Sequence, residues 1–315
     1  MHSIIQTTYE KIKEVKIQGA TNVAIETFKA VKEWLNTTEF TSPKQLVEET
    51  LKNLKYLAEA RPNEPLAKNG VRFFVHKTSL LIQQYHITQI SELKQNINQI
   101  FDEYLQLISE AKARIVKYGA QIIKPDKILF THCHSSTAES VIVEANKYLP
   151  KTVIVTETRP LYQGRITARH LVSHNIDTIM IVDSASPRFI ADDSFLPVDS
   201  ILIGADEILP TGDFINKVGS FSIGLAAKTY KKPLYVVTPA LKLDFFADLN
   251  SVKIELRNPT EIWKNAPPGL KIINPAFDLV HHQFISGFIT EFGVVEPTEL
   301  ASRVKQHYPW VTLTI

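Results

Sequence analysis

The spacing of apolar residues predicts helices over the first part of the chain. In residues 23–35 the apolar positions recur at helical steps, at Val23, Ala24, Phe28, Val31 and Leu35. Residues 90–117 repeat this spacing over a longer stretch, and we expect that helix to end before Gly119.

The start of another helix is marked by Ser42, Pro43 and Gln45. Serine caps a first turn, proline suits the first helical position, and a glutamine three residues after the serine completes a capping box. We expect this helix to stop near Arg61-Pro62, because proline disfavours helical geometry in the residue before it.

From residue 125 onward, short runs of Ile, Val and Leu replace the helical period. These runs occupy residues 126–131, 152–156, 177–182, 200–204 and 233–238. Segments suited to helices lie between most of them, at 136–147, 164–174 and 216–230. Continuous apolar strands that alternate with helices indicate a parallel sheet covered on both faces, so we predict an α/β domain after a helical one.

Composition excludes several classes of protein. The net charge of +2 argues against a nucleic-acid-binding surface or an acidic tail. No run of about 18 apolar residues predicts a membrane span, and the N-terminus predicts no secretion signal. The single cysteine, Cys133, excludes an internal disulfide and provides too few thiolates for a cysteine-based zinc site. We therefore expect a cytoplasmic protein.

Polar groups follow each apolar run, where parallel strands bring their carboxyl ends to one edge of the sheet. Cys133, Arg159, Asp183, Asp206 and Lys242 all follow a predicted strand. Ligands of open parallel sheets bind at this edge. Five strands with the same property favour an active site over a set of unrelated caps and surface groups.

Cys133 has two interpretations from its sequence context. A free cysteine is commonly a small buried apolar residue. Cys133, however, stands near the start of a predicted helix, whose dipole lowers the pKa of a thiol and suits a base or nucleophile. Its neighbours His132 and His134 suggest a metal site, but alternate residues of an extended segment point to opposite faces, which disfavours one.

The other candidates each have a structural alternative. Ser135, Ser136 and Thr137 suit a phosphate cradle or a helix cap, and no dinucleotide or P-loop fingerprint is present. Asp206 suits a general acid if burial raises its pKa, or a turn cap. Asn216 and Lys217 are predicted to open a helix and to hold an anion there, or to solvate the surface. Arg159 and Arg165 suit phosphate binding or an ion pair.

Several ordered motifs, taken together, resemble one superfamily. It contains ribose-1,5-bisphosphate isomerases, methylthioribose-1-phosphate isomerases and the regulatory alpha, beta and delta subunits of the exchange factor for translation initiation factor two. The motifs are Thr131-His132-Cys133, Glu157-Thr158-Arg159-Pro160 with Gln163-Gly164, Gly204-Ala205-Asp206, Ile215-Asn216-Lys217-Val218-Gly219, Arg257-Asn258-Pro259-Thr260-Glu261 and Asn274-Pro275-Ala276-Phe277-Asp278.

The resemblance implies a fold and a site. The family fold is a helical domain, here 1–120, followed by a Rossmann-like α/β catalytic domain, here 121–315. The catalytic pair of the isomerases matches Cys133 and Asp206. The residues implied to bind substrate are Gln18, Gly19, Ala20, Thr21, Arg61, Ser135, Ser136, Thr137, Arg159, Asn216, Lys217 and Lys242. The short chain and the Asn-Pro-Ala-Phe-Asp segment look most like the ribose-1,5-bisphosphate branch.

One position departs from that branch. Gln18-Gly19-Ala20-Thr21 replaces a stretch that usually begins with arginine, so a neutral side chain takes the place of a charged phosphate ligand. Methylthioribose-1-phosphate isomerase therefore stays open as an alternative, as does a non-catalytic regulatory relative that binds a sugar phosphate or nucleotide.

The reaction implied by the ribose-1,5-bisphosphate branch is an aldose–ketose isomerisation. Asp206 is expected to act as acid and Cys133 as base, with α-D-ribose 1,5-bisphosphate as substrate and D-ribulose 1,5-bisphosphate as product. We expect no metal, no nicotinamide cofactor, no nucleic acid and no membrane partner. The family also implies a homodimer or a dimer-based hexamer.

Overall fold

The computed structural model describes residues 3–85, 89–250 and 252–315, and only the backbone of residues 82–85. The chain divides into two compact units, and neither is one continuous stretch. Unit 1 comprises Met1–Glu110, Leu241–Phe246 and Ser302–Ile315, and unit 2 comprises Ala111–Ala240 and Ala247–Ala301. The C-terminal residues thus belong to the unit that the N-terminal helices form.

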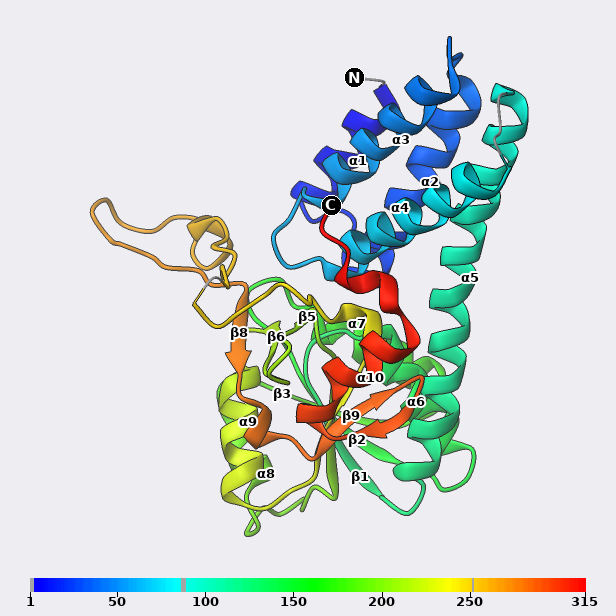
Figure 1. The fold of residues 1–315 in the computed structure, drawn as a ribbon. Helices are drawn as coiled ribbons and strands as arrows, with labels where there is room; N and C mark the ends of the chain where they lie inside the picture. Colours follow the sequence, from blue (N-terminus) through cyan, green and yellow to red (C-terminus); the bar gives the residue numbers. More distant parts are fainter. Residues whose placement is uncertain (1–2, 86–88, 251) are drawn as a thin grey trace. The chain divides into compact units, whose positions relative to one another are not determined.

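Unit 1 is helical, as the apolar spacing predicts. Its helices α1, α2, α3 and α4 lie side by side (Figure 1) and are joined by the first part of α5. Their bounds are α1 Ser3–Lys13, α2 Ala20–Thr37, α3 Pro43–Ala58, α4 Pro65–Tyr85 and α5 Ile90–Ile122. The predicted start of α3 is confirmed, because Ser42 Oγ accepts the backbone N–H of Gln45 and Pro43 occupies the first turn.

Aromatic residues fill the core of unit 1. The rings of Phe28 and Phe101 meet edge to face with centroids 5.3 Å apart, and Phe28 also packs on Tyr104. The fully buried Tyr104 hydroxyl donates to the backbone oxygen of Leu66 at 2.6 Å. This bond satisfies a polar group that would otherwise be costly to bury.

The predicted end of the long helix is wrong. Helix α5 runs past Gly119 to Ile122. Gly119 serves packing instead, because a Cβ there would lie 2.8 Å from the side chain of Val141. A glycine that permits close helix contact looks, in sequence, the same as one that ends a helix.

Unit 2 is built on a seven-stranded sheet in the order β10-β9-β7-β4-β1-β2-β3. All neighbouring strands are parallel except the pair β9 and β10. The strands are β1 Ile128–Thr131, β2 Thr152–Thr156, β3 Asp177–Ile181, β4 Ser200–Ile203, β7 Leu234–Val237, β9 Gly287–Thr290 and β10 Gly293–Val295. The predicted α/β fold with a parallel sheet is confirmed.

Helices connect most of these strands, and α10 and η6 follow the last one. The α-helices are α6 Ser136–Asn146, α7 Gly164–Ser173, α8 Ser186–Ile190, α9 Ser220–Thr229 and α10 Leu300–His307. Short 3₁₀ helices are η1 Asp183–Ala185, η2 Ala240–Lys242, η3 Pro259–Glu261, η4 His282–Phe284, η5 Pro297–Glu299 and η6 Pro309–Thr312. No α-helix among the described residues combines the length and apolarity that crossing a bilayer requires.

A second, three-stranded antiparallel sheet was not predicted. It consists of β5 Glu207–Ile208, β6 Phe214–Lys217 and β8 Phe277–Val280, in the order β5-β6-β8. The prediction that Asn216 and Lys217 open a helix is therefore wrong. Both residues end β6, and α9 begins only at Ser220, after Gly219 turns the chain with φ 107°. Strand β6 pairs with β8, which lies about sixty residues further along the chain, and local spacing does not reveal a pairing of this kind.

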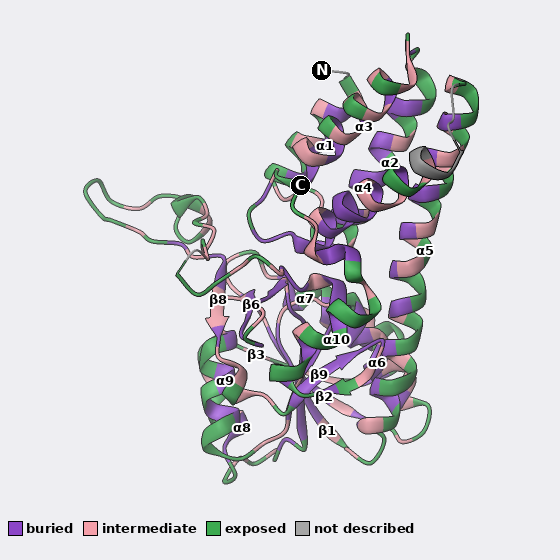
Figure 2. Cartoon of the chain, in the orientation of Figure 1, coloured by how far each residue is buried: buried purple, intermediate pink, exposed green. Residues whose placement is uncertain are grey.

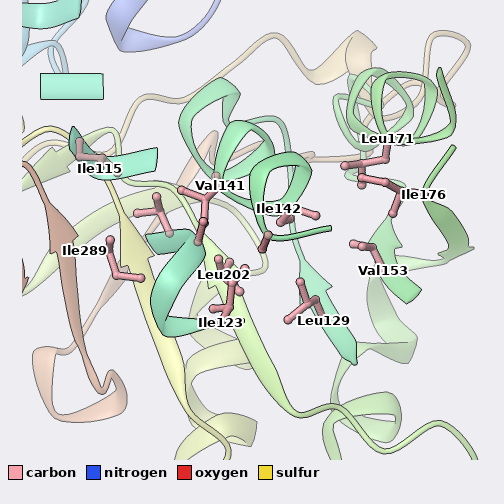
Figure 3. Close-up of a cluster of buried hydrophobic side chains, with 14 of the residues drawn as sticks. Ile115, Ile123, Leu129, Val141, Ile142, Val153, Leu171, Ile176, Leu202 and Ile289 are labelled. Carbon is pink, nitrogen blue, oxygen red and sulfur yellow. The ribbon is translucent and has the colours of Figure 1, made fainter. Parts of the chain in front are cut away.

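Apolar side chains fill one face of the large sheet. Ile115, Ile123, Val141 and Ile142 belong to one buried cluster with residues of the strands, such as Leu129 and Leu202 (Figure 3). The strands β1, β2 and β4 consist almost entirely of buried residues, which appear in purple in Figure 2. Their burial explains why the sequence shows continuous rather than alternating apolar runs.

The order of the strands defines a switch point between β1 and β4. The chain proceeds from β1 to β2 and β3 on one side, and then returns to place β4 on the other side of β1. Ligands of doubly wound sheets bind outside the carboxyl ends of the strands at such a point. The loops after β1 and β4 are therefore where a ligand of unit 2 is expected.

Candidate active site

Cys133 and Asp206 flank this switch point. Cys133 follows β1 in a left-handed backbone conformation with φ 67°, and its side chain is half-buried. Asp206 follows β4, and its backbone N–H donates to Ile215 O at 2.8 Å. Gly204 lets the two loops approach, because a Cβ there would lie 2.9 Å from the side chain of Ser135.

The Cys133 thiol responds to charges from several loops. Burial raises its pKa to about 11, and the carboxylates of Asp206 and Asp183 act in the same direction. The Lys217 ammonium and the backbone N–H of His134 act against this shift. The charges of Asp206 and Lys217 thus both act on the Cys133 thiol, and the sequence analysis had assigned these three residues to one site.

The sequence context suggested a lowered thiol pKa, whereas the environment of Cys133 in the structure raises it. The predicted helix is present, with Ser135 as the N-cap of α6 and its Oγ accepting the backbone N–H of Ala138 at 3.3 Å. Cys133 precedes that cap by two residues and thus lies outside the first turn, where the helix dipole acts most strongly. Burial dominates instead.

His132 is a buried structural partner rather than a solvent-facing base. Its Nε2 lies 2.9 Å from the carbonyl oxygen of Val218, and its Nδ1 lies 2.6 Å from Thr156 Oγ1. Burial lowers the pKa of His132, so the imidazole is neutral near pH 7. A carbonyl only accepts, which places the single ring proton on Nε2 and makes Nδ1 an acceptor.

The loop after β2 binds the backbone of Cys133. The Cys133 N–H donates to Thr158 Oγ1 at 3.0 Å. Thr158 is fully buried and, like Cys133, has a positive φ, of 60°. Its own N–H and that of Arg159 donate to Oδ1 and Oδ2 of Asp183 at 2.8 and 2.6 Å.

A second polar cluster lies on the other side of Cys133. Glu139 is buried on α6 and accepts hydrogen bonds from Thr167 Oγ1 and His134 Nδ1, both at 2.6 Å. Burial pushes the pKa of Glu139 upward, but these two hydrogen bonds, together with the charges of His134 and His170, outweigh it and lower the pKa. Thr167 Oγ1 also lies 2.8 Å from the Cys133 carbonyl oxygen, so the cluster borders Cys133.

The residues predicted to bind phosphate in unit 2 have different environments. Ser136 and Thr137 lie in the first turn of α6, with Ser136 exposed and Thr137 buried. Asn216 is buried and donates from Nδ2 to Ser220 Oγ at 2.8 Å. Lys217 lies over the ring of Phe277, 4.8 Å from its centroid.

The first turn of α9 is already capped by a carboxylate. Asp278 Oδ2 accepts the backbone N–H groups of Gly219 and Phe221 at 2.7 and 3.0 Å. Gly219 is required next to His132, because a Cβ there would lie 3.0 Å from the imidazole ring at an unfavourable φ. The turn at Gly219 therefore packs closely against the His132 ring.

Arg159 joins two motifs of unit 2. Its guanidinium donates to Tyr162 Oη at 2.6 Å and to Ile262 O at 3.0 Å. Arg165 stacks on the Tyr162 ring and faces Glu157 across 3.6 Å. Arg165 thus faces the carboxylate partner that the sequence left as an alternative to phosphate binding, whereas the Arg159 guanidinium binds a hydroxyl and a carbonyl oxygen.

The remaining predicted residues belong to unit 1. Gln18 and Gly19 are exposed, and Gly19, with φ 83°, is the N-cap residue of α2, whose first residues are Ala20 and Thr21. Arg61 is buried and pairs with Glu64 at 2.9 Å. Lys242 is half-buried at the end of η2.

Within the described parts of the chain, no group of three His, Cys, Asp or Glu residues has an arrangement suited to a metal ion. The sequence analysis named Asp183 only as a group at a strand end and Thr158 only as a member of a motif. It missed Glu139 and Thr167, which no local pattern marks.

Comparison with known proteins identifies the family. A model of the initiation factor 2 subunit family matches residues 16–297, and the chain therefore belongs to this family, as its motifs predicted. The solved structures of two Pyrococcus horikoshii proteins share the fold. Translation initiation factor eIF-2B has a TM-score of 0.79 at 23% identity, covering 94% of this chain and 98% of that one. The 5-methylthioribose 1-phosphate isomerase has a TM-score of 0.77 at 24% identity, covering 97% and 87%.

Curated relatives from two isomerase groups align over most of the chain. The ribose 1,5-bisphosphate isomerase of Thermococcus kodakarensis is 30% identical over 308 residues, covering 96% of this chain and 94% of that protein. The methylthioribose-1-phosphate isomerase of Caldanaerobacter subterraneus is 36% identical over 279 residues, covering 81% and 77%. The expectation of an enzyme of the isomerase class agrees with both names.

Proposed function

We propose that the chain is an aldose–ketose isomerase that converts α-D-ribose 1,5-bisphosphate to D-ribulose 1,5-bisphosphate. The observation that carries the proposal is the placement of Cys133 directly after β1 and of Asp206 directly after β4, at the switch point of the sheet. A thiol and a carboxylate provide an acid and a base, and the Lys217 ammonium attracts a phosphate. The Thermococcus kodakarensis relative, which aligns over nearly the whole chain, supports this substrate.

The chemistry needs one proton donor and one proton acceptor. The phosphate on carbon 1 prevents simple opening to an aldehyde. Cys133, as base, removes the proton at carbon 2 while Asp206 protonates the ring oxygen, so the bond from carbon 1 to that oxygen breaks and an enol forms. The enol hydroxyl on carbon 2 then gives its proton to Asp206, and Cys133 returns its proton to carbon 1. Each positioned group typically contributes roughly 10²–10⁴-fold.

A second substrate, methylthioribose 1-phosphate, is favoured by two observations. The Caldanaerobacter subterraneus relative is 36% identical, although over a smaller part of the chain. Gln18, moreover, replaces the arginine expected for a second phosphate, and it is neutral and exposed. The same pair of residues serves both reactions, because both start from a ribose that carries a phosphate on carbon 1.

We also propose a homodimer or dimer-based hexamer in the cytoplasm. Large apolar side chains are exposed on α9, where Phe221 and Leu225 lie one turn apart, and on the edge strand β3 at Met180. Exposed apolar groups of this kind favour association. Light scattering is expected to give at least twice the chain mass of 35.6 kDa, and a monomer would contradict the proposal.

The test of substrate is a comparison of kcat/KM for the two sugar phosphates. We expect turnover of α-ribose 1,5-bisphosphate to exceed that of methylthioribose 1-phosphate at least tenfold. The reverse preference would make the second substrate the correct one. Binding of either compound without turnover would favour the non-catalytic regulatory alternative.

A further inference from the structure

Two strained residues face one another at the ends of β1 and β2. Cys133 and Thr158 both have a left-handed backbone conformation, with φ of 67° and 60°. Residues other than glycine rarely adopt this conformation, and residues branched at Cβ adopt it least of all. A single hydrogen bond of 3.0 Å, from Cys133 N–H to Thr158 Oγ1, joins them. Strain of this kind persists only where the surroundings hold it in place, and it gathers at functional sites.

Asp183 holds the turn that contains Thr158. Its two carboxylate oxygens accept the N–H groups of Thr158 and Arg159 at 2.8 and 2.6 Å. Hydrogen bonds to an ionised acceptor are the strong ones, so this contact fixes the turn at the end of β2 from the end of β3. The ends of three adjacent strands are thus connected in the order β3, β2, β1.

The hydrogen bonds that join His132, Thr156 and Thr158 can be assigned one consistent set of donors and acceptors. His132 donates from Nε2 to Val218 O, so its Nδ1 accepts from Thr156 at 2.6 Å. Thr156 has then used its single proton, and Thr158, 3.2 Å away, donates to it. The lone pairs of Thr158 Oγ1 are left for the Cys133 N–H.

We propose that Thr158, fixed by Asp183, is a positioning residue that holds the backbone of Cys133 so that its thiol faces the substrate. The inference rests on the proposed function for its catalytic consequence. Without the hydroxyl, the Cys133 N–H loses its acceptor and the residue relaxes toward an ordinary conformation. A displacement of about 1 Å can cost roughly 10²-fold in rate.

Steady-state kinetics of Thr158→Val test the catalytic part. The substitution keeps the branched shape and removes the hydroxyl, and we expect kcat to fall roughly 30- to 100-fold with KM changed less than about threefold. Thr158→Ser restores the hydroxyl and is expected to recover activity to within about fivefold of the parent. The matched control is Thr27→Val, since Thr27 Oγ1 is buried in unit 1 without a hydrogen-bond partner in the described residues.

Alkylation by iodoacetamide tests the position of the thiol without any substrate. Cys133 is the one cysteine of the chain, so the reaction reports on it alone. We expect the apparent pKa of the reaction to fall in Thr158→Val from about 11 toward the ordinary value of 9.0, because a displaced thiol is less buried, with faster alkylation at neutral pH. The parent and the Thr27→Val control keep the high value.

The outcomes separate the two proposals. A parent protein without isomerase activity defeats the proposed function, yet alkylation still decides whether Thr158 positions the thiol. Unchanged kcat and an unchanged alkylation profile in folded Thr158→Val would overturn the inference. If a thermal melt shows that this variant is unfolded, Thr158→Ala takes its place, because alanine removes the hydroxyl without a branched side chain at a left-handed residue.

Discussion

A polar group with a shifted pKa is buried at each end of the large sheet, Lys151 at one end and Cys133 at the other. Only the end that holds Cys133 has the properties of an active site. At the amino end of β2, burial lowers the pKa of Lys151, whose Nζ donates to the carbonyl oxygens of Ile123, Lys124 and Asp126. An ammonium has three protons, so all of its donors are used. At the carboxyl end of β1, the Cys133 thiol has strained backbone and charges of both signs around it.

The difference shows that a perturbed pKa alone does not locate chemistry. Lys151 is a satisfied group that ties the segment after α5 to the sheet, whereas Cys133, the proposed base, lies at the edge where parallel sheets bind ligands. Strain, opposed charges and the correct edge of the sheet together mark the candidate site. If this distinction holds, substitutions at the carboxyl end lower catalytic activity, and substitutions at the amino end lower the stability of the fold.

The largest expected effect is on catalysis at the carboxyl end. Asp206→Asn removes the proton donor while keeping the shape, and we expect kcat to fall roughly 10³-fold with the melting temperature unchanged. Asp193→Asn is the matched control, because the Asp193 side chain is 78% exposed and pairs with Arg188 at the surface. Similar turnover in both variants would remove Asp206 from the mechanism.

Lys151→Met is expected to give the opposite result at the amino end. It leaves three carbonyl oxygens without their donor, which costs about 2–4 kcal/mol of unfolding free energy. Urea denaturation measures this loss, and kcat of the folded protein stays at the parent value. Lys147→Met is the control, because the Lys147 side chain is 65% exposed and its substitution is expected to cost less than about 0.5 kcal/mol. A stable but inactive Lys151→Met variant would contradict the comparison.

The pH dependence of Cys133 alkylation tests the raised pKa of the thiol. A thiol with a pKa of about 11 is protonated near neutrality, and only its thiolate reacts with iodoacetamide. We expect the alkylation rate of the folded protein to increase about tenfold per pH unit between about pH 7 and pH 10, whereas the rate of an unfolded chain levels off near the ordinary thiol pKa of 9.0. A rate that levels off near pH 9 in the folded protein would contradict the raised pKa of Cys133.

The smallest effect is expected at the buried hydroxyl of Thr27, which is far in sequence from both Cys133 and Lys151. Thr27 is fully buried on α2, and its Oγ1 has no partner among the described residues. Thr27→Val replaces the hydroxyl with a methyl group and is expected to stabilise the protein by up to about 1 kcal/mol, with kcat unchanged. A loss of stability in urea denaturation would show that the hydroxyl does have a partner.

Sequence reasoning recovered the elements whose signal is local. The strands β1, β2, β3, β4 and β7 were predictable because each is one continuous apolar run. The cap at Ser42 was predictable because its geometry depends on three neighbouring positions. Strands β6 and β8 were not, since Phe214 and Val280 pair across a long separation in the chain.

The same distinction applies to the candidate site. Cys133, Asp206 and Lys217 stand out because reactive residue types follow apolar strands in recognisable motifs. The raised pKa of Cys133 was not predictable, because it depends on burial and on the distant Asp206 and Asp183. The role of Thr158 was hidden for a similar reason, as a positive φ leaves no mark on a threonine in the sequence.

The most direct test of the account is a time course of α-ribose 1,5-bisphosphate followed by ³¹P and ¹H NMR, with the parent protein and Cys133→Ser side by side. We expect D-ribulose 1,5-bisphosphate to accumulate with the parent and the rate to fall roughly 10²–10⁴-fold in the folded variant. Equal rates in both would contradict the role of Cys133. No product with either would contradict the proposed reaction.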